Sequence, residues 1–385
     1  MSRLEYLLAA AVLRVLGWGF NLLPGRPRRV VLASPRKANL DGNLLAIDAA
    51  IRAQRPDVDL VVLPEPYAYG LRGKLAYALR MVRGMYHLRT AGVVVVDNAW
   101  LPIHVARHPA RTVVVQIWHA AGALKRFGLD ATGPVGEPER TFLHRHYDWV
   151  ITSGDSSREP WSRALRTPID RVVALGSPRT DVFFDTAAAA AARGRILAKY
   201  PDLVDRRVIT YAPTFRGRGR AKRPAGDLDA VRLRASLPPG DALVLKSHPN
   251  LDPSLVDKAA FDVVVDPADD MNDLLLVTDV LITDYSSAIF EWALLRRQLV
   301  LLIPDLADYE LDPGLYLDYR TEMIGTQAVD TDGVIRAIGA DDFAVSSYDA
   351  FVLRHLSACD GASAIRFVRQ MVPPADLQAE APVRS

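Results

Sequence analysis

The sequence contains a single cysteine, Cys359, among its 385 residues. One thiol cannot form an internal disulfide, and it cannot supply the clustered thiolates of a structural zinc site. An excess of charge of one sign is also missing, because 47 basic and 45 acidic residues leave a formal net charge of +2. This balance gives no electrostatic reason to expect a nucleic-acid partner, and we expect none.

Several motifs of phosphate-binding and hydrolytic enzymes are absent as well. The chain has no GxxxxGK[ST] loop, and no GxGxxG follows its first predicted strand, which disfavours a P-loop NTPase and a dinucleotide-binding fingerprint. It has no HExxH motif or Cys/His cluster that would indicate zinc. A Ser/His/Asp hydrolase is only weakly supported, since no GxSxG elbow occurs.

Half of the residues are hydrophobic, and the length exceeds that of one ordinary core, so two domains are expected. Short β-branched segments alternate with helical patterns, which predicts α/β domains with doubly wound, mostly parallel sheets. The predicted strands are residues 30–33, 60–63, 93–96, 112–117, 149–152, 172–175, 208–211, 243–246, 263–265, 280–283 and 299–303. The predicted helices include residues 44–52, 71–89, 140–147, 186–200 and 348–371.

This alternation divides the chain into five parts. Residues 28–185 and 186–345 are predicted to form two Rossmann-like domains. A helix at residues 1–27 precedes them, and C-terminal helices at 346–372 and a flexible tail at 373–385 follow them.

The N-terminal helix is strongly apolar over residues 4–23, close to the ~20 residues that span a bilayer. In a spanning helix Arg14 would lie at mid-membrane, at a cost of about 2.5–3.5 kcal/mol. Arg14 and Asn21 share one helical face, while Trp18 suits the lipid interface. We therefore expect an amphipathic helix on an anionic membrane surface, with the basic residues 26–29 beside the headgroups. The alternative is a helix packed on the protein's own core.

A polar turn, Asp284-Tyr285-Ser286-Ser287, separates the predicted strand 280–283 from a helical pattern at 288–295. Backbone N–H groups and the positive end of the helix dipole converge at such a helix start, which favours an anion site. From the turn alone, serines that merely cap a helix are the simpler interpretation. An acidic, aromatic loop at residues 305–319 follows the next strand and favours a ligand-binding rim.

Ligands of open α/β sheets bind beyond the carboxyl ends of the strands, and polar residues follow several other strands here. His119 follows strand 112–117 and suits a general base, because an imidazole titrates near neutrality. A lone histidine is equally well explained as structural. The other strand-end candidates are Lys125, Arg179, Thr214, Arg216, Lys246 and His248.

At these positions the chain resembles the CDP-glycerol glycerophosphotransferases that build teichoic acids. The matching segments are QIWHAAGALKRFGLD (116–130), GSPRTDVFF (176–184), ITYAPTFR (209–216), LKSHPN (245–250) and the block from residue 279 to LYLDY (315–319). The resemblance implies a GT-B fold, with an acceptor domain at 28–185 and a CDP-glycerol-binding domain at 186–345.

The resemblance also implies roles for individual residues. The expected catalytic residues are His119, as general base, and His248. The expected substrate-binding residues are Lys125, Arg179, Thr214, Arg216, Lys246, Asp284, Tyr285, Ser286, Ser287 and Glu291, the last placed to accept from a ribose hydroxyl. No metal or other cofactor is expected.

The implied reaction transfers glycerol phosphate from CDP-glycerol to an undecaprenyl-diphosphate-linked acceptor or a teichoic acid chain and releases CMP. The enzyme would act as a peripheral protein at the cytoplasmic face of the cell membrane. Three alternatives remain open: a GT-B glycosyltransferase with a nucleotide-sugar donor, a ribitol-phosphate transferase with CDP-ribitol, and a membrane-bound scaffold without turnover.

Overall fold

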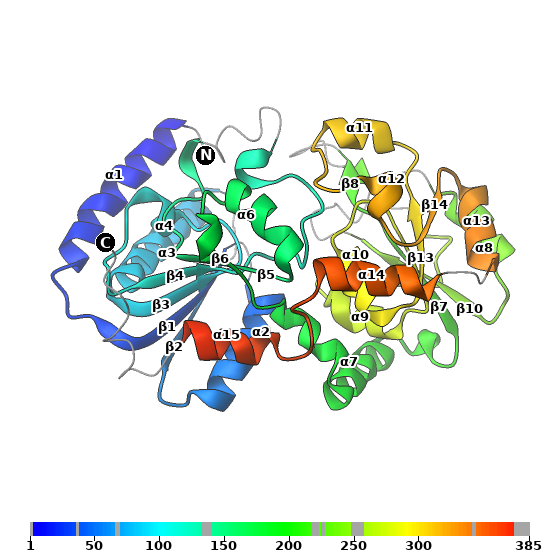
Figure 1. Cartoon of the computed structure of the whole chain (residues 1–385), viewed down its shortest axis with the longest axis horizontal. Helices are drawn as coiled ribbons and strands as arrows, with labels where there is room; N and C mark the ends of the chain where they lie inside the picture. Colours follow the sequence, from blue (N-terminus) through cyan, green and yellow to red (C-terminus); the bar gives the residue numbers. More distant parts are fainter. Residues whose placement is uncertain are drawn as a thin grey trace. The chain divides into compact units, whose positions relative to one another are not determined.

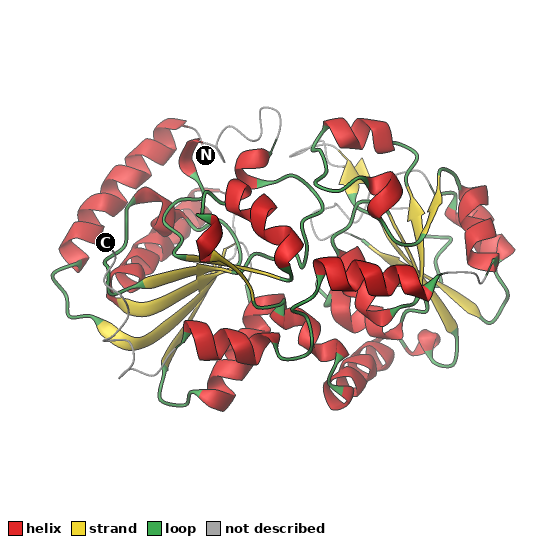
Figure 2. Cartoon of the chain, in the orientation of Figure 1, coloured by secondary structure: helices red, strands yellow, loops and turns green. Residues whose placement is uncertain are grey.

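The computed structural model describes residues 3–35, 38–65, 70–131, 141–216, 223–224, 228–247, 258–340 and 344–372. The chain forms two compact units, each built on one parallel six-stranded sheet with helices on both faces (Figures 1 and 2). Unit 1 comprises Met1–Ala120, Arg126–Asp181 and Ser357–Ser385, and unit 2 comprises Ala121–Lys125 and Val182–Leu356. The predicted α/β class with doubly wound sheets is confirmed.

The sheet of unit 1 has the strand order β2-β1-β3-β4-β5-β6. Its strands are β1 (Arg26–Pro35), β2 (Asp59–Glu65), β3 (Ala91–Val96), β4 (Val113–Gln116), β5 (Trp149–Thr152) and β6 (Val172–Ala174). Strand β3 reads AGVVVV and is buried along its whole length, as expected for a central parallel strand covered on both faces. The covering helices are α2 (Gly42–Gln54), α3 (Gly70–Thr90), α4 (Leu101–Val105), α6 (Arg158–Ala164) and α15 (Ser363–Met371).

The core of unit 1 joins distant parts of the sequence. Helices α2 and α15 lie side by side on one face of the sheet (Figure 1), although more than 300 residues separate them. Leu44 and Ile47 of α2 meet Phe367 of α15 in the same hydrophobic cluster. The last described helix therefore helps to cover the sheet formed by the first part of the chain.

The sheet of unit 2 has the strand order β11-β10-β7-β12-β13-β14. Its strands are β7 (Arg207–Ala212), β10 (Asp241–Lys246), β11 (Val263–Val265), β12 (Val280–Thr283), β13 (Gln298–Leu302) and β14 (Thr326–Ala328). The order of connection reverses between β7 and β12, so the loops after these strands lie at a topological switch point, where open α/β sheets bind ligands.

The helices of unit 2 are α7 (Thr186–Lys199), α8 (Ala230–Ser236), α9 (Met271–Val277), α10 (Ala288–Leu295), α11 (Leu306–Leu311), α12 (Tyr319–Glu322), α13 (Thr331–Gly339) and α14 (Val345–His355). A short antiparallel pair, β8 (Phe215–Arg216) with β9 (Arg223–Pro224), extends the loop after β7.

Two predicted helices differ from the structure. The helix predicted at 140–147 is wrong over residues 143–147, where His144 and His146 adopt left-handed φ values of 52° and 66°. The predicted helix 348–371 is interrupted after His355, and Gly361 at φ 86° lies in the connection to α15. Left-handed residues end a right-handed helix because the backbone no longer follows its path.

The N-terminal helix α1 (Arg3–Phe20) packs against α3 and α4, and its Tyr6 and Leu13 side chains are buried. Arg14, on the helical face that it shares with Asn21, donates from Nε to the Val105 carbonyl of α4 at 2.6 Å. Helix α1 also exposes apolar residues: Leu7, Leu8, Val12, Val15 and Trp18. Among the described residues, no helix combines enough length with enough hydrophobicity to cross a bilayer.

Candidate functional site

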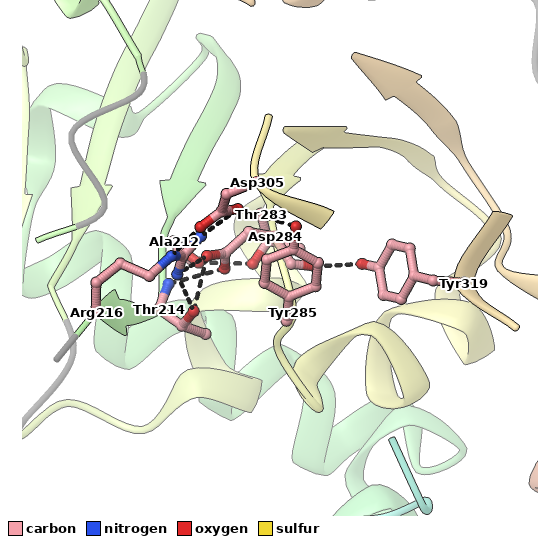
Figure 3. A network of polar contacts seen from close by, with 8 residues as sticks. All are labelled: Ala212, Thr214, Arg216, Thr283, Asp284, Tyr285, Asp305 and Tyr319. Atoms are coloured by element: carbon pink, nitrogen blue, oxygen red, sulfur yellow. Dashed lines mark hydrogen bonds and ion pairs between the residues drawn. The ribbon is translucent and has the colours of Figure 1, made fainter. Parts of the chain in front are cut away.

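A polar network occupies the switch point of unit 2 (Figure 3). Thr214, two residues after β7, donates to the Asp284 carboxylate from its N–H at 2.8 Å and from its hydroxyl at 2.7 Å. Arg216 donates from Nη1 to the same carboxylate at 2.8 Å. Because Asp284 directly follows β12, these contacts join the loops after two neighbouring strands. The structure thus brings together three of the expected substrate-binding residues.

The Arg216 guanidinium lies between two carboxylates. Its Nε and Nη2 donate to the two oxygens of Asp305, at 2.6 and 3.1 Å, opposite its bond to Asp284. It also lies 5.2 Å from the ring centroids of Tyr285 and Tyr309. Although burial opposes its charge, the carboxylates hold the pKa of Arg216 above its ordinary value. Arg216 is therefore a fixed cation whose charge is balanced within the protein.

Three tyrosines complete the network. The Tyr285 ring stacks on Tyr309 with centroids 3.7 Å apart, and its hydroxyl donates to Asp305 at 3.0 Å. The Tyr319 hydroxyl donates to the Asp284 carbonyl. Burial raises the pKa of all three phenols, so they stay neutral, and Tyr285 and Tyr319 act as donors.

The loop predicted as a ligand-binding rim at residues 305–319 is therefore divided. Asp305, Tyr309 and Tyr319 turn inward and support the Asp284–Tyr285 turn, while Asp308 and Glu310 are exposed. The three inward residues support the Asp284–Tyr285 turn. Asp308 and Glu310 therefore remain as the candidates for a ligand-binding rim.

The strand–turn–helix arrangement after β12 matches the sequence prediction. Helix α10 begins at Ala288, whose N–H donates to the Ser286 hydroxyl at 3.2 Å. Ser287 occupies the N-cap position, and its hydroxyl caps none of the described amides of the first turn. Glu291, one turn into the helix, is only 2% exposed. A helix start with a partly unsatisfied set of N–H groups is a favourable place for an anion.

Lys125 is the last residue of a short segment that belongs to unit 2, although the residues before and after this segment belong to unit 1. The segment Ala121–Lys125, which we call the strap, pairs with the loop before α12: Lys125 forms an antiparallel bridge to Leu315, and the Leu124 carbonyl accepts from Tyr316 N–H at 2.9 Å. The Lys125 ammonium lies 5.3 Å from the Tyr309 centroid. Burial lowers the pKa of Lys125 to about 8, and Asp284 opposes this effect. Lys125 therefore lies at the edge of the Arg216 network.

Lys246 lies apart from this network. Its ammonium donates to the carbonyls of Asp266 and Asp269, both at 2.7 Å. Burial lowers the pKa of Lys246 to about 8. In the structure this lysine ties the end of β10 to the connection between β11 and α9.

His119 is exposed and lies in unit 1, three residues after β4. Its Nδ1 is 3.4 Å from the carbonyl oxygen of Asp97, at the end of β3. A carbonyl can only accept, so this contact favours the tautomer with hydrogen on Nδ1. The lone pair of the neutral ring is then on Nε2, which is the form that a general base requires.

Arg179, in the 3₁₀ turn Pro178–Phe183, lies against the His119 loop. Its Nη1 donates to the His119 carbonyl at 3.2 Å. The other expected catalytic residue, His248, lies outside the described residues, as does most of the basic run at 217–223. Within the described ranges, no group of three or more His, Cys, Asp or Glu side chains is arranged to hold a metal ion.

The residues that support the His119 loop were not predicted from the sequence. Asn43 at the start of α2 donates to the Trp118 carbonyl at 3.0 Å, and Gln116 accepts from Trp118 N–H at 2.8 Å. A glutamine at the end of an otherwise β-branched, buried strand was a usable signal for Gln116. Asn43 gave no such signal, because polar residues are common at helix starts.

Comparison with known proteins identifies related chains. The sequence profile of the CDP-glycerol:poly(glycerophosphate) glycerophosphotransferase family matches residues 20–372. A teichoic acid poly(ribitol-phosphate) polymerase of Bacillus spizizenii is 33% identical over 370 residues, covering 94% of this chain and 59% of the polymerase. A teichoic acid ribitol-phosphate primase of the same organism is 31% identical over 355 residues, covering 90% of this chain and 91% of the primase.

A solved structure of the wall teichoic acid polymerase TagF has a TM-score of 0.73 to this chain, with 20% identity, and covers 98% of each chain. The likeness confirms the GT-B-like fold expected from the sequence. The chain spans less than two thirds of the length of the ribitol-phosphate polymerase.

Proposed function

Because the chain belongs to the CDP-glycerol:poly(glycerophosphate) glycerophosphotransferase family, we propose that it transfers a polyol phosphate from a CDP-linked donor to a hydroxyl group of a teichoic acid precursor or growing chain and releases CMP. The observation that carries this proposal is the family match over residues 20–372, which includes both sheets, His119 and the α10 helix start.

The proposed chemistry assigns the base to His119. Its Nε2 accepts the proton of the acceptor hydroxyl as the oxygen attacks the polyol-bearing phosphorus of the donor. A new phosphorus–oxygen bond forms, the anhydride bond to the CMP oxygen breaks, and CMP leaves with the negative charge. The Nδ1 contact to Asp97 supports this role, since it directs the basic lone pair to Nε2.

The donor diphosphate is proposed to bind at the switch point of unit 2. The N–H groups at the α10 start, the Ser286 and Ser287 hydroxyls and Lys125 supply donors and positive charge there. Because Asp284 and Asp305 already balance the charge of Arg216, we assign this arginine mainly to holding the turn in place. His248 is retained as a further diphosphate contact on the sequence resemblance alone.

For the donor, we favour CDP-ribitol over the CDP-glycerol expected from the sequence. Both relatives described above have names that specify ribitol phosphate. CDP-glycerol remains the second candidate because the family is named for it. A nucleotide-sugar donor is the third, since a GT-B-like fold alone does not separate phosphotransferases from glycosyltransferases.

The test is a donor panel with an undecaprenyl-diphosphate-linked acceptor. Purified protein receives CDP-ribitol, CDP-glycerol or UDP-sugars in separate reactions, and release of CMP or UDP is followed. We expect CMP release from a CDP-polyol, with CDP-ribitol used best. UDP release from a sugar donor, with both CDP-polyols left intact, would replace this function with glycosyl transfer.

We also propose that α1 holds the enzyme at an anionic membrane surface, as a peripheral protein at the cytoplasmic face. Val15 and Trp18 are 69% and 71% exposed on a face that the described part of unit 1 leaves uncovered. Val15→Asp combined with Trp18→Asp should weaken sedimentation with phosphatidylglycerol vesicles, because it removes apolar area from the lipid contact. Leu353→Asp, at a 76% exposed position on α14, is the control. Equal sedimentation of both variants and wild type would refute the proposal.

A further inference from the structure

Trp118 places His119 through an unusual backbone conformation. Its φ is 51°, in the left-handed region, which bulky residues rarely adopt because the backbone there is strained. The Trp118 ring stacks on Phe127 with centroids 4.6 Å apart, and it lies 4.5 Å from the His119 ring. Such a conformation persists only where surrounding contacts hold it. The contacts that hold it are therefore relevant to the orientation of the imidazole.

Both peptide groups that flank His119 are held by hydrogen bonds. The Trp118 N–H donates to Gln116 Oε1 at 2.8 Å, and the Trp118 carbonyl accepts from Asn43 Nδ2 at 3.0 Å. The next carbonyl, that of His119, accepts from Arg179 Nη1 at 3.2 Å. These groups come from the ends of β4, the start of α2 and the turn after β6, so three separate elements fix one loop.

Asn43 connects these supports. Its Nδ2 donates to the Trp118 carbonyl, while its Oδ1 accepts from the Ser177 hydroxyl and from Arg179 N–H, both at 3.0 Å. The orientation of the amide is determined by its partners, because a backbone N–H can only donate and a carbonyl can only accept. The side chain is 4% exposed, so water does not readily replace these bonds.

We propose that Asn43 is the positioning residue for His119. The inference rests on the proposed function of His119 as base. Asn43 contacts neither reacting atom. It binds both the Trp118 carbonyl and the Arg179 backbone and so fixes their relative positions. In the proposal, this directs Nδ1 of His119 to the Asp97 carbonyl and Nε2 of His119 to the acceptor hydroxyl. A general base that is misplaced by about 1 Å loses on the order of 10²-fold in rate.

Two substitutions distinguish the donor Nδ2 of Asn43 from its acceptor Oδ1. Asn43→Asp keeps an acceptor for Ser177 and Arg179 but sets a carboxylate oxygen against the Trp118 carbonyl. Asn43→Leu has a similar volume, carries no charge and removes all three bonds. We expect kcat to fall about 10- to 100-fold in both variants, with the donor KM changed less than about twofold, because the lost interaction acts on the chemical step.

The control is Ile47→Val, one turn further along α2 in the core of unit 1. It should lower the midpoint of thermal unfolding slightly and leave kcat unchanged, which separates positioning from a general loss of stability. Ser177→Ala is the milder second variant: it removes one acceptor contact of Asn43 and should lower kcat less than Asn43→Leu does. Wild-type kcat in folded Asn43→Leu and Asn43→Asp would overturn the proposal.

A second readout does not depend on turnover. Histidine-labelled protein reports the tautomer of each imidazole by long-range proton–nitrogen NMR, and the His119 signals are assigned by their loss in His119→Ala. We expect the Nδ1–H form of His119 in the wild type and a mixture of tautomers in Asn43→Leu. An unchanged His119 tautomer in Asn43→Leu would contradict the positioning role. Absence of CMP release by the wild-type protein with every donor would instead contradict the proposed function and leave the tautomer result valid.

Discussion

The imidazole of His119 carries the proposed proton transfer, and its loss should stop the reaction. We expect His119→Ala to release CMP at least about 10²-fold more slowly than the wild type, the usual contribution of a general base. His248→Ala should abolish release as well, through loss of diphosphate binding. CMP release is measured over a range of donor concentrations, with circular dichroism to confirm folding.

A surface histidine of unit 1 is the matched control for these variants. His146 has a left-handed φ of 66°, which asparagine tolerates, so His146→Asn should keep full activity. Full activity in His119→Ala would remove its assignment as the base.

Arg216 contributes chiefly to stability. Arg216→Met would leave the Asp284 carboxylate, which is 4% exposed, without its cationic partner. Breaking a buried pair in this way costs about 3–5 kcal/mol, so we expect a loss of that size in the free energy of unfolding in urea. The control is Arg52→Met, which removes an exposed pair with Asp48 and should cost about 0.5 kcal/mol or less. Equal losses in the two variants would contradict the assignment.

Glu65, at the end of β2, should make stability depend on pH. It is 4% exposed, and burial raises its pKa to about 7, against smaller opposing effects of Trp100 and Arg80. Between the ordinary value of 4.5 and about 7, the folded state keeps a proton that the unfolded state has released. The free energy of unfolding is therefore highest below pH 4.5, where Glu65 is protonated in both states. It falls as pH rises toward 7, because only the unfolded state then releases the proton.

Glu65→Gln is neutral at every pH and should remove this dependence. Relative to its value at pH 4.5, the unfolding free energy of the variant at pH 8 should exceed that of the wild type by about 3 kcal/mol. Thermal unfolding of both proteins at a series of pH values measures the difference. Parallel curves would show that Glu65 ionises normally in the folded state.

At the scale of single residues, the sequence identified groups that directly follow strands. His119, Asp284 and Ser286 could be named because polar residues interrupt an apolar pattern there. Which residues contact each other could not be predicted. Arg216 and Asp305 are 89 residues apart, and Asn43 and Ser177 are 134 apart, so only the strand order brings each pair together.

At the scale of elements, the strap is the part of the site most dependent on close packing. A Cβ atom at Gly122 would lie 2.3 Å from Cε1 of Phe290, whose ring is fully buried. Gly122→Ala must therefore displace the strap or the ring of α10, and we expect a loss of about 1–3 kcal/mol in stability.

Gly194→Ala in α7 is the control, because no described heavy atom lies within 4 Å of a Cβ built there. That substitution should raise stability by about 0.5–1 kcal/mol, the usual gain in a helix interior. Thermal unfolding distinguishes the two outcomes. A neutral or stabilising Gly122→Ala would show that the strap does not pack as described.

All eleven predicted strands are present, because buried parallel strands are short runs of β-branched and apolar residues. Strand β14 was missed, since Thr326-Gln327-Ala328 has no such pattern and pairs only at the edge of the sheet. The docking of the strap on unit 2 was also missed. Its sequence, AGALK, shows neither the hydrophobic periodicity of a helix nor that of a strand, and its position depends on the loop at residues 315–316.

At the scale of the whole molecule, the two units divide the proposed work. Unit 1 carries His119 and its supports, and unit 2 carries the α10 start, the Arg216 network and the strap. Sequence reasoning found both sheets because each repeats the same strand–helix alternation. It did not find that α15 returns to unit 1, because the order of elements along the chain does not determine which sheet a terminal helix covers.

The most direct test of the central claim follows the phosphorus atom that the acceptor attacks. CDP-ribitol and CDP-glycerol are prepared with radiophosphorus in the polyol phosphate and incubated with the enzyme and the lipid-linked acceptor. The account predicts that the label enters the acceptor, that the released CMP is unlabelled and that transfer is lost in His119→Ala. Label in the nucleotide product, or undiminished transfer in His119→Ala, would contradict it.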